Sequence, residues 1–240
     1  MKFIDPNDLA YWYPKIKDIA PTPKTVIITT DLDLLGGIED GLPLRSYDEF
    51  FNSIENAIDK IGGCPIFIRT GLTSAKHGWC TTCHVKSIND IRKQVYNIIE
   101  FSACASMEGL SCKTWAIREL LPVAPVFAAF GNMPVTQEIR YFVHDGIITH
   151  KQPYWPPDVF KGQEKSLPDD WEARLASVSN MEFDDSDLRE YTKNISMIMK
   201  KSNPFLNLGY WSVDWLNTKN GWYLIDMALG HQSYIWDSKK

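Results

Sequence analysis

The sequence predicts an α+β fold in which helix-covered strands come first and antiparallel hairpins follow. Between residues 24 and 121, apolar and β-branched runs alternate with two stretches of helical periodicity. In the second half, Asp145-Gly146 and Asn220-Gly221 join apolar runs, and such pairs are strong hairpin signals. The sequence contains no internal repeat. One large domain or two small ones therefore account for the 240 residues.

The N-terminal elements can be assigned one by one. Residues 1–23 contain four prolines and an aromatic cluster, which indicates a packed arm. The β-branched run 24–30 is typical of a strand buried on both faces. Residues 32–43 resemble a loop. Ser46 offers a helix N-cap with Glu49 three positions later, and a helical period then continues until Gly62-Gly63.

The next elements repeat the alternation of strand and helix. We expect a strand at 65–70, a polar loop to about Thr82, a helix within 87–107, and a strand at 114–121 that ends at Pro122. The later elements are hairpin strands 135–143 and 147–152, a Pro-rich aromatic loop 153–170, a helix from Asp185 to about Lys201, and hairpin strands 209–216 and 222–227.

Composition indicates a folded chain without a membrane partner. Apolar residues make up 44% and charged residues 23%, which excludes disordered, collagen-like and coiled-coil classes. No apolar run approaches the roughly 20 residues that span a bilayer. The first residues lack the apolar segment of a signal peptide, so we expect a cytoplasmic protein. The net charge of 25 − 30 = −5 gives no general attraction to nucleic acid.

Five cysteines, an odd number, favour reduced thiols over a disulfide framework. Cys80-Thr-Thr-Cys83-His84 matches the haem-attachment pattern and also resembles a redox pair or half a zinc site. Haem attachment requires export, and a four-ligand zinc site would have to recruit Cys104 and Cys112 from an unusual spacing. Ordinary loop thiols are the favoured interpretation.

Asp214 and Asp226 lie among apolar residues of the last hairpin, and buried carboxylates need partners. With a two-residue loop Asn220-Gly221, Asp214 pairs with Met227 and the aspartates face opposite sides. With a three-residue loop 219–221, Asp214 lies opposite Asp226, with Cβ atoms about 5 Å apart. Mg²⁺ between them would relieve the repulsion. Two unrelated aspartates bonded to loops are the alternative.

Three further segments carry candidate binding groups. Arg69 ends a strand and is followed by Thr73, Ser74 and Lys76, a pattern that suits phosphate or a solvated loop, but not a P-loop. Glu138 and Arg140 share one strand face, as site residues or as a structural ion pair. Residues 117–121 are a plain central strand, or a strand whose end presents backbone groups to a planar base.

In chain order these segments resemble the ATP-grasp fold. Gly62-Gly-Cys-Pro-Ile-Phe-Ile-Arg69 is similar to its "G-x-P-x-x-x-K" strand, and Ile117-Arg-Glu-Leu-Leu121 to its hinge strand. Glu138-Ile-Arg140 with Phe142-Val143 and Gly146 resembles "E-x-R-x-F-V-x-x-G". Val213-Asp214 and Gly221 to Asp226 resemble "V-D … D-G-x-x-x-x-E-x-N", which supplies the metal carboxylates.

The segments 69–77, 152–156 and 226–228 resemble, more narrowly, short ATP-grasp proteins of bacteriophages and bacteria. Those proteins are distantly similar to the cell division cycle protein 123 family. Arg69 stands where the family has lysine, Asp226 where it has glutamate, and Ala228 where it has a metal-binding asparagine.

The resemblance implies two α+β subdomains that hold ATP between them. It implies an N-terminal arm (1–23), an N-terminal α/β subdomain (24–115) with the phosphate-binding strand and a lid loop at 73–79, and a C-terminal subdomain (116–240) with the metal site. The implied activity is ATP-dependent ligation of a carboxylate to an amine or thiol, on small-molecule or peptide substrates, through an acyl phosphate. A non-catalytic ATP-binding assembly factor and a Cys-based metal or redox protein are the alternatives.

The resemblance also implies roles for individual residues. Lys76, Arg140 and Lys151 would act on the transferring group, and Asp214 and Asp226 would hold Mg²⁺. The residues that would bind ATP are Arg69, Thr73, Ser74, Lys76, Glu119, Leu120, Leu121 and Glu138.

Overall fold

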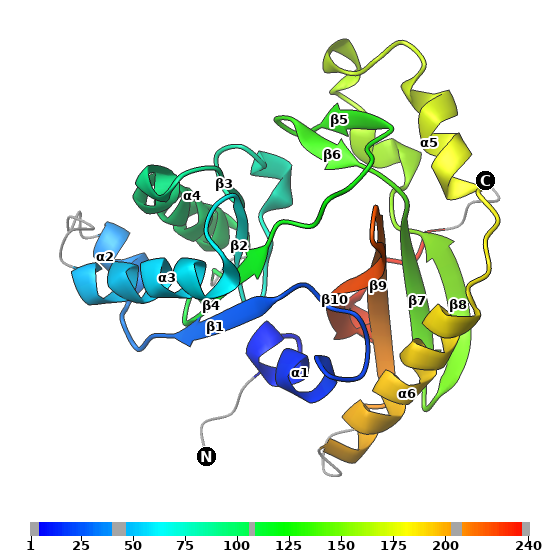
Figure 1. The fold of residues 1–240 in the computed structure, drawn as a ribbon, viewed down its shortest axis with the longest axis horizontal. Coiled ribbons are helices and arrows are strands. Elements are labelled where there is room, and N and C mark those ends of the chain that lie inside the picture. Colours follow the sequence, from blue (N-terminus) through cyan, green and yellow to red (C-terminus); the bar gives the residue numbers. More distant parts are fainter. Residues whose placement is uncertain (1–4, 40–46, 106–108, 203–207, 237–240) are drawn as a thin grey trace.

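The computed structural model describes residues 5–39, 47–105, 109–202 and 208–236. Its strands form two four-stranded antiparallel sheets and one two-stranded hairpin, and Figure 1 shows the two sheets side by side with helix α1 beneath them. The mixed helix and strand content confirms the predicted α+β class. No helix in the described ranges is long and apolar enough to cross a membrane.

The first sheet has the order β1-β4-β2-β3. Alternation along its strands directs Ile68, Trp115 and Ile117 into a core under the helices. The opposite face of β2 and β4 carries Arg69 and Arg118 and turns toward the second sheet. The elements are β1 (Thr25–Thr29), α2 (Leu34–Glu39), α3 (Asp48–Ile61), β2 (Ile66–Thr70), β3 (His84–Val85), α4 (Ile91–Cys104) and β4 (Thr114–Glu119).

The second sheet has the order β10-β9-β7-β8, and helix α6 packs against one face through Leu188, Ile195 and Met199. The expected turn is present between β7 and β8, where Asp145 and Gly146 both have positive φ, 51° and 80°. The elements are β7 (Glu138–His144), β8 (Ile147–Pro153), α6 (Ser186–Ser202), β9 (Tyr210–Thr218) and β10 (Gly221–Leu229).

A third, smaller unit covers the top of the molecule in Figure 1. Hairpin β5 (Phe127–Ala129) and β6 (Met133–Val135) packs with helix α5 (Trp171–Ser179) around Phe160 and Trp155. Short 3₁₀ helices complete the fold: η2 (Lys76–Gly78), η3 (Ile88–Asp90), η4 (Pro157–Phe160), η5 (Glu164–Ser166) and η6 (Gly230–Gln232).

The N-terminal arm folds as helix α1 (Leu9–Ile16), capped by the Asp8 carboxylate, which accepts a hydrogen bond from the Ala10 N–H at 2.8 Å. Leu9, Trp12 and Ile16 enter the same core as strands of the second sheet and Ala116 of β4. The arm therefore joins the two sheets.

Several sequence expectations need correction. Residues 34–39, expected as loop, form α2, and the expectations missed α5 and β5. Ser46 lies outside the described residues, and α3 follows Tyr47 without a side-chain cap. The proposed boundary at 115/116 falls inside β4, which pairs with β1 and β2 of the first sheet.

Candidate functional site

A cleft with about 820 Å³ of space, its open mouth included, lies between the two sheets. The cleft gathers predicted residues from strands far apart in the sequence. Those that line it are Arg69, Ser74, Lys76, Glu119, Leu120, Leu121, Glu138, Asp214 and Asp226.

Asp214 and Asp226 are cross-strand partners on β9 and β10. The turn is a two-residue loop, because Thr218 pairs with Gly221 across Lys219 and Asn220. A bulge between Leu224 and Asp226 then shifts the register by one residue and brings Asp226 opposite Asp214. The second sequence alternative was therefore right about the pairing and wrong about its cause.

Each aspartate is paired with an arginine. Arg140 lies opposite Asp214 in the β7–β9 ladder and holds it through two bonds, from Nε at 2.7 Å and Nη2 at 2.8 Å. Burial would lower the pKa of Arg140, but Asp214 raises it above its usual value. Arg69 reaches across from the first sheet, with Nη1 2.9 Å from Asp226 Oδ2. Arg69 therefore joins the two sheets through an ion pair.

Lys76 is held in a buried polar and aromatic environment. Its Nζ lies 3.4 Å from Glu138 Oε2 and over the rings of Tyr154 and Trp155, at 3.9 and 4.3 Å from the centroids. The Trp155 indole N–H donates to Glu138 Oε1 at 2.8 Å. Burial alone would lower the pKa of Lys76, but Glu138 and then Tyr154 raise it, so the ammonium stays charged.

Arg118 was missed as a candidate. It is 3% exposed, lines the cleft, and donates from Nη1 to the Ile225 carbonyl at 2.7 Å and from Nε to Thr25 Oγ1 at 3.2 Å. Its Nη2 is buried and has no hydrogen-bond partner among the described residues. Burial, and then Arg69, lower the pKa of Arg118 to about 10. A buried donor without a partner beside a second guanidinium fits an anion.

The alternation of β4 contained a signal for Arg118. Arg118 is a charged residue in a run that is otherwise mostly apolar and buried. It lies two residues after Ala116, so the two face the same side of β4, and Ala116 pairs with Arg69 of β2. Charged side chains on a buried strand face need a partner or a ligand.

The end of β4 presents unused backbone groups. Among the described residues, neither the N–H nor the C=O of Leu120 or Leu121 forms a hydrogen bond. The Glu119 carboxylate accepts from the Lys24 N–H at 2.7 Å. Apolar side chains from three strands, Phe67, Met133 and Leu216, line the same cleft. This combination suits a planar heterocycle that needs both apolar walls and edge hydrogen bonds.

Residues 73–79, the segment predicted to act as a lid, contact the β5–β6 hairpin. The His77 ring stacks on Phe130 with centroids 4.3 Å apart and planes 9° apart, and the Cys80 thiol bonds to the Gly131 carbonyl at 2.7 Å. Thr73 shapes the turn into this loop, because its N–H donates to Thr70 Oγ1 at 3.1 Å. Thr73 does not line the cleft in this structure, so its expected contact with nucleotide stays a prediction.

Lys151 lies away from the cleft. It pairs with Tyr141, whereas Gln152 pairs with Arg140, and neighbouring residues of a strand face opposite sides. Its Nζ forms an ion pair with Asp185 at 2.6 Å, together with the Tyr141 hydroxyl. This geometry corrects the expected catalytic role of Lys151, which stabilises the N-terminal end of α6 instead.

Nothing among the described residues supports a metal or redox site at Cys80 and Cys83. Cys83 is fully buried beside aromatic residues, and burial raises the pKa of its thiol to about 12, so little thiolate is present. No group of three His, Cys, Asp or Glu side chains able to hold a metal occurs in the ranges that the structure describes.

Two carboxylates alone suit Mg²⁺, which usually takes one or two protein carboxylates and completes its shell with water and substrate phosphates. Each oxygen of Asp214 accepts one bond from Arg140 and keeps a further lone pair. Asp226 accepts the Met227 N–H at 3.0 Å and the Arg69 contact. Ala228 occupies the position of the expected asparagine and has no side-chain oxygen to offer a metal. It pairs with Ser212 across the strands. The residues present therefore fit one Mg²⁺ with phosphate.

No family model and no curated protein matches the sequence. Solved structures do match. Cdc123 from Schizosaccharomyces pombe is 14% identical, with a TM-score of 0.54, and its C-terminally truncated form is 13% identical, with a TM-score of 0.55; each comparison covers 95% of this chain and 87% of that chain. An ATP-grasp RimK domain protein from Sphaerobacter thermophilus is 11% identical, with a TM-score of 0.49, over 95% of this chain and 59% of that chain. The expected similarity to the cell division cycle protein 123 family is confirmed at the level of the fold.

Proposed function

For a chain with this fold and this cleft, we propose an ATP-dependent ligase that joins a carboxylate to an amine, or to a thiol, through an acyl phosphate. The observation that carries the proposal is the charge pattern of the cleft. Arg69, Arg118 and Lys76 converge on one space, and the carboxylates of Asp214 and Asp226 stand opposite each other at its floor. A polyphosphate with Mg²⁺ would satisfy both groups, because its phosphates pair with the three cationic side chains and its metal ion pairs with the two carboxylates.

The base and the phosphates would bind at different ends of the cleft. The free backbone groups of Leu120 and Leu121 would bond to the edge of adenine, between Phe67 and Leu216. The buried Nη2 of Arg118 and the guanidinium of Arg69 would bind phosphate oxygens. Ser74 and Lys76 of the lid would cover the phosphates from above, and Glu138 would hold Lys76 in place.

Arg140 is suited to bind the substrate carboxylate beside the γ-phosphate. Its Nε and Nη2 are fixed by Asp214, and Nη1, which makes only a 3.5 Å contact with the Tyr234 carbonyl, would orient an incoming carboxylate. One carboxylate oxygen would form a bond to the γ-phosphorus as the bond to the β,γ-bridging oxygen breaks, releasing ADP. The amine nitrogen would then bond to the acyl carbon and lose a proton as phosphate leaves. Mg²⁺ held by Asp214 and Asp226 would neutralise charge on the phosphates.

The contacts of the lid loop favour a mechanism with a water-sensitive acyl phosphate intermediate. The His77–Phe130 stack and the Cys80 contact hold the lid loop over the β5–β6 hairpin. An acyl phosphate hydrolyses readily, so a covered cleft favours capture by the amine over hydrolysis.

The first test is a thermal-shift titration of the metal-free protein with ATP, with and without Mg²⁺. A ligand that binds only the folded state raises the midpoint of unfolding. We expect a Mg²⁺-dependent rise, followed by ADP release only when a carboxylate and an amine are both supplied from a screen of small molecules and peptides. No rise with saturating Mg-ATP would contradict the proposal.

A second candidate is an ATP-binding assembly factor that uses nucleotide as a conformational ligand. Two observations favour it: the fold similarity to Cdc123 and the arginine partner on each metal-site carboxylate. Arg69 links the two sheets through Asp226, so a nucleotide that engages Arg69 would change how the sheets are held together. Such a protein would show the Mg-ATP shift without ADP release under any pair of substrates.

A further inference from the structure

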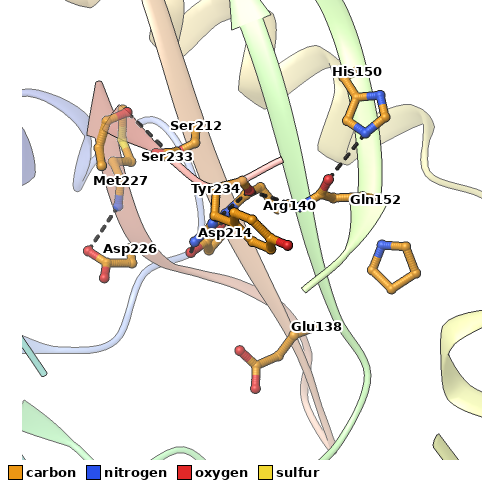
Figure 2. Close-up of polar contacts among 12 residues, drawn as sticks. Glu138, Arg140, His150, Gln152, Ser212, Asp214, Asp226, Met227, Ser233 and Tyr234 are labelled. Atoms are coloured by element: carbon orange, nitrogen blue, oxygen red, sulfur yellow. Dashed lines mark hydrogen bonds and ion pairs between the residues drawn. The ribbon is translucent and has the colours of Figure 1, made fainter. Parts of the chain in front are cut away.

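Residues Ser233–Trp236, here called the strap, cross the face of the second sheet beside Arg140. The strap follows η6 and is fixed at both ends. Ser233 Oγ lies 2.6 Å from Ser212 Oγ, and the Trp236 indole N–H donates to the Pro153 carbonyl at 3.0 Å. Figure 2 draws Tyr234 beside Arg140, whose Nη1 contacts the Tyr234 carbonyl, with Gln152 on the neighbouring strand.

The side chain of Gln152 binds two backbone groups of the strap, at Tyr234 and Trp236. The amide Nε2 donates to the Tyr234 carbonyl at 3.1 Å, and Oε1 accepts the Trp236 N–H at 3.1 Å. Gln152 is 4% exposed, so these bonds are formed away from bulk water. Its third contact is with His150 Nε2 at 3.2 Å, drawn in Figure 2.

The strap is not part of the hydrophobic core. The side chains of Tyr234 and Ile235 are 67% and 48% exposed, although both are large and apolar or aromatic. Packing therefore gives no reason for the strap to lie where it does. Its contacts with Gln152 and Arg140 are made by backbone atoms, which any extended segment offers.

The contact between the strap and Arg140 is the weakest in this group. Arg140 Nη1 donates to the Tyr234 carbonyl at 3.5 Å, beyond the usual range for N–H···O bonds, while Nε and Nη2 bind Asp214 at 2.7 and 2.8 Å. A carboxylate oxygen would bond to the same nitrogen at about 2.7–2.9 Å with charge assistance. A neutral carbonyl at this distance is easily displaced by an anion.

Arg140 lies next to the cleft, bound to its lining residue Asp214 and 4.8 Å from the ring centroid of its lining residue Tyr154. We propose that the strap is a gate at Arg140, in which the Tyr234 carbonyl occupies the Nη1 nitrogen until a substrate carboxylate displaces it. Gln152 sets how tightly the gate is held and is a positioning residue. The inference rests on the proposed function, because it takes Arg140 as the carboxylate ligand. It adds a competition between the substrate and a segment of the same chain.

The competition has a reciprocal consequence. If strap and carboxylate exclude each other at Arg140, a change that loosens the strap must tighten carboxylate binding by a corresponding factor. Gln152→Leu removes both backbone bonds with little change in volume. His150→Ala, the matched control, removes the third contact of Gln152 and leaves both bonds to the strap in place.

The rate of hydrogen exchange at the Trp236 amide measures directly how often the strap detaches from Gln152. Gln152→Leu is expected to speed exchange at this amide by about tenfold or more, since two hydrogen bonds of ordinary net strength are lost. His150→Ala is expected to leave it unchanged. Acetate, the simplest carboxylate probe, is then titrated against chloride at constant ionic strength in the presence of Mg-ADP, and we expect it to speed Trp236 exchange in the wild-type protein.

The decisive comparison is the acetate concentration for half-maximal effect on the midpoint of thermal unfolding. It is expected to be several-fold lower in Gln152→Leu than in the wild type and in His150→Ala. Equal values, or no acetate effect in any of the proteins, overturn the gate. Inorganic phosphate in place of acetate separates the sources, because an equal response to phosphate would show a general anion site and overturn the assignment to carboxylate. The Mg-ATP thermal shift is measured in parallel, so failure of the gate and failure of the proposed function are distinguishable.

Discussion

Asp226 stands directly opposite Asp214 only because Ile225 bulges out of the β9–β10 ladder. The same bulge frees the Ile225 carbonyl, which accepts a hydrogen bond from Arg118 Nη1 at 2.7 Å. One extra residue therefore has two effects. It brings two carboxylates together for a cation, and it gives a buried arginine of the first sheet a partner on the second.

The first prediction concerns the metal site. Asp226→Asn removes one of two facing carboxylates and leaves the shape of the side chain almost unchanged. We expect the Mg²⁺ concentration for half-maximal ATP-dependent thermal shift to rise at least about tenfold, equivalent to about 1.4 kcal/mol. The midpoint without ligand should fall modestly, because buried Arg69 loses its ion pair but can still donate a hydrogen bond to the introduced amide oxygen.

Asp158→Asn is the matched control, since Asp158 is exposed and forms a surface ion pair with Lys161. It should behave as the wild type. Unchanged Mg²⁺ dependence in Asp226→Asn would remove this residue from the metal site.

The second prediction concerns the arginine that the sequence analysis missed. Arg118→Gln should lower affinity for ATP about 10- to 100-fold, because a hydrogen bond to a charged group contributes about 1.5–3 kcal/mol. Affinity for adenosine, which lacks phosphate, should stay as in the wild type. Equilibrium binding of both ligands by calorimetry separates a lost phosphate contact from a damaged fold.

Arg174→Gln, at an exposed arginine of α5, serves as the control for loss of positive charge. An equal loss of ATP and adenosine affinity in Arg118→Gln would mean that Arg118 supports the cleft rather than binds phosphate.

The third prediction is a pH dependence of lid closure. Burial, and then Lys76, lower the pKa of His77 from its usual value of 6.5 in the closed lid. The open lid therefore binds the proton more tightly than the closed lid. Closure is fully favoured above pH 6.5 and weakens as the pH falls below it, by at most about tenfold per unit for one proton.

His77→Phe keeps the stack on Phe130 without a titrating group. Hydrogen exchange of residues 73–79 measured between pH 5 and 7.5, after correction for intrinsic exchange, should show more opening at low pH in the wild type and a flatter profile in the variant. The pKa of His84, beside Trp79, is also lowered by burial, so His84→Gln measures the remaining slope. Identical profiles in wild type and His77→Phe would contradict the prediction.

The fourth prediction separates Lys151 from the site. Lys151→Met should leave the Mg-ATP shift and any ADP release unchanged. Asp185 keeps its bonds to Tyr141 and Arg189, so the free energy of unfolding should fall by at most about 1 kcal/mol. Loss of nucleotide binding in a variant with normal stability would return Lys151 to the cleft.

Local patterns in the sequence predicted most strands and the three long helices α3, α4 and α6. Their apolar residues recur at helical spacing, and α3 ends at a clear signal, Gly62. Local patterns did not predict α2 or α5. The first contains Gly36 and Gly37, which disfavour a helix, and the second has a short and weak apolar face. Packing against neighbouring elements decides such segments.

The site was predicted from motif order more than from local pattern. Arg69, Asp214 and Asp226 could be named because they end or interrupt apolar strands. Arg118 was recognisable as a charged residue in a mostly apolar run, but its place in the cleft could not be predicted without knowing which face of β4 turns toward the second sheet. Lys151 was misplaced for the same reason, since the pairing of β8 with β7 decides which of 151 and 152 faces the cleft.

Helix α1 has a consequence for how the chain reaches this structure. Asn7 bonds to Leu229 and Gln232, residues 222 and 225 positions away, and Leu9, Trp12 and Ile16 bury against strands made last. During synthesis helix α1 leaves the ribosome long before its partners exist, so its apolar face stays uncovered until the residues of β10, up to Leu229, have emerged. Such non-local contacts slow folding. We expect the nascent chain to depend on chaperones over this interval, and the final assembly step to be the docking of α1 onto β9 and β10.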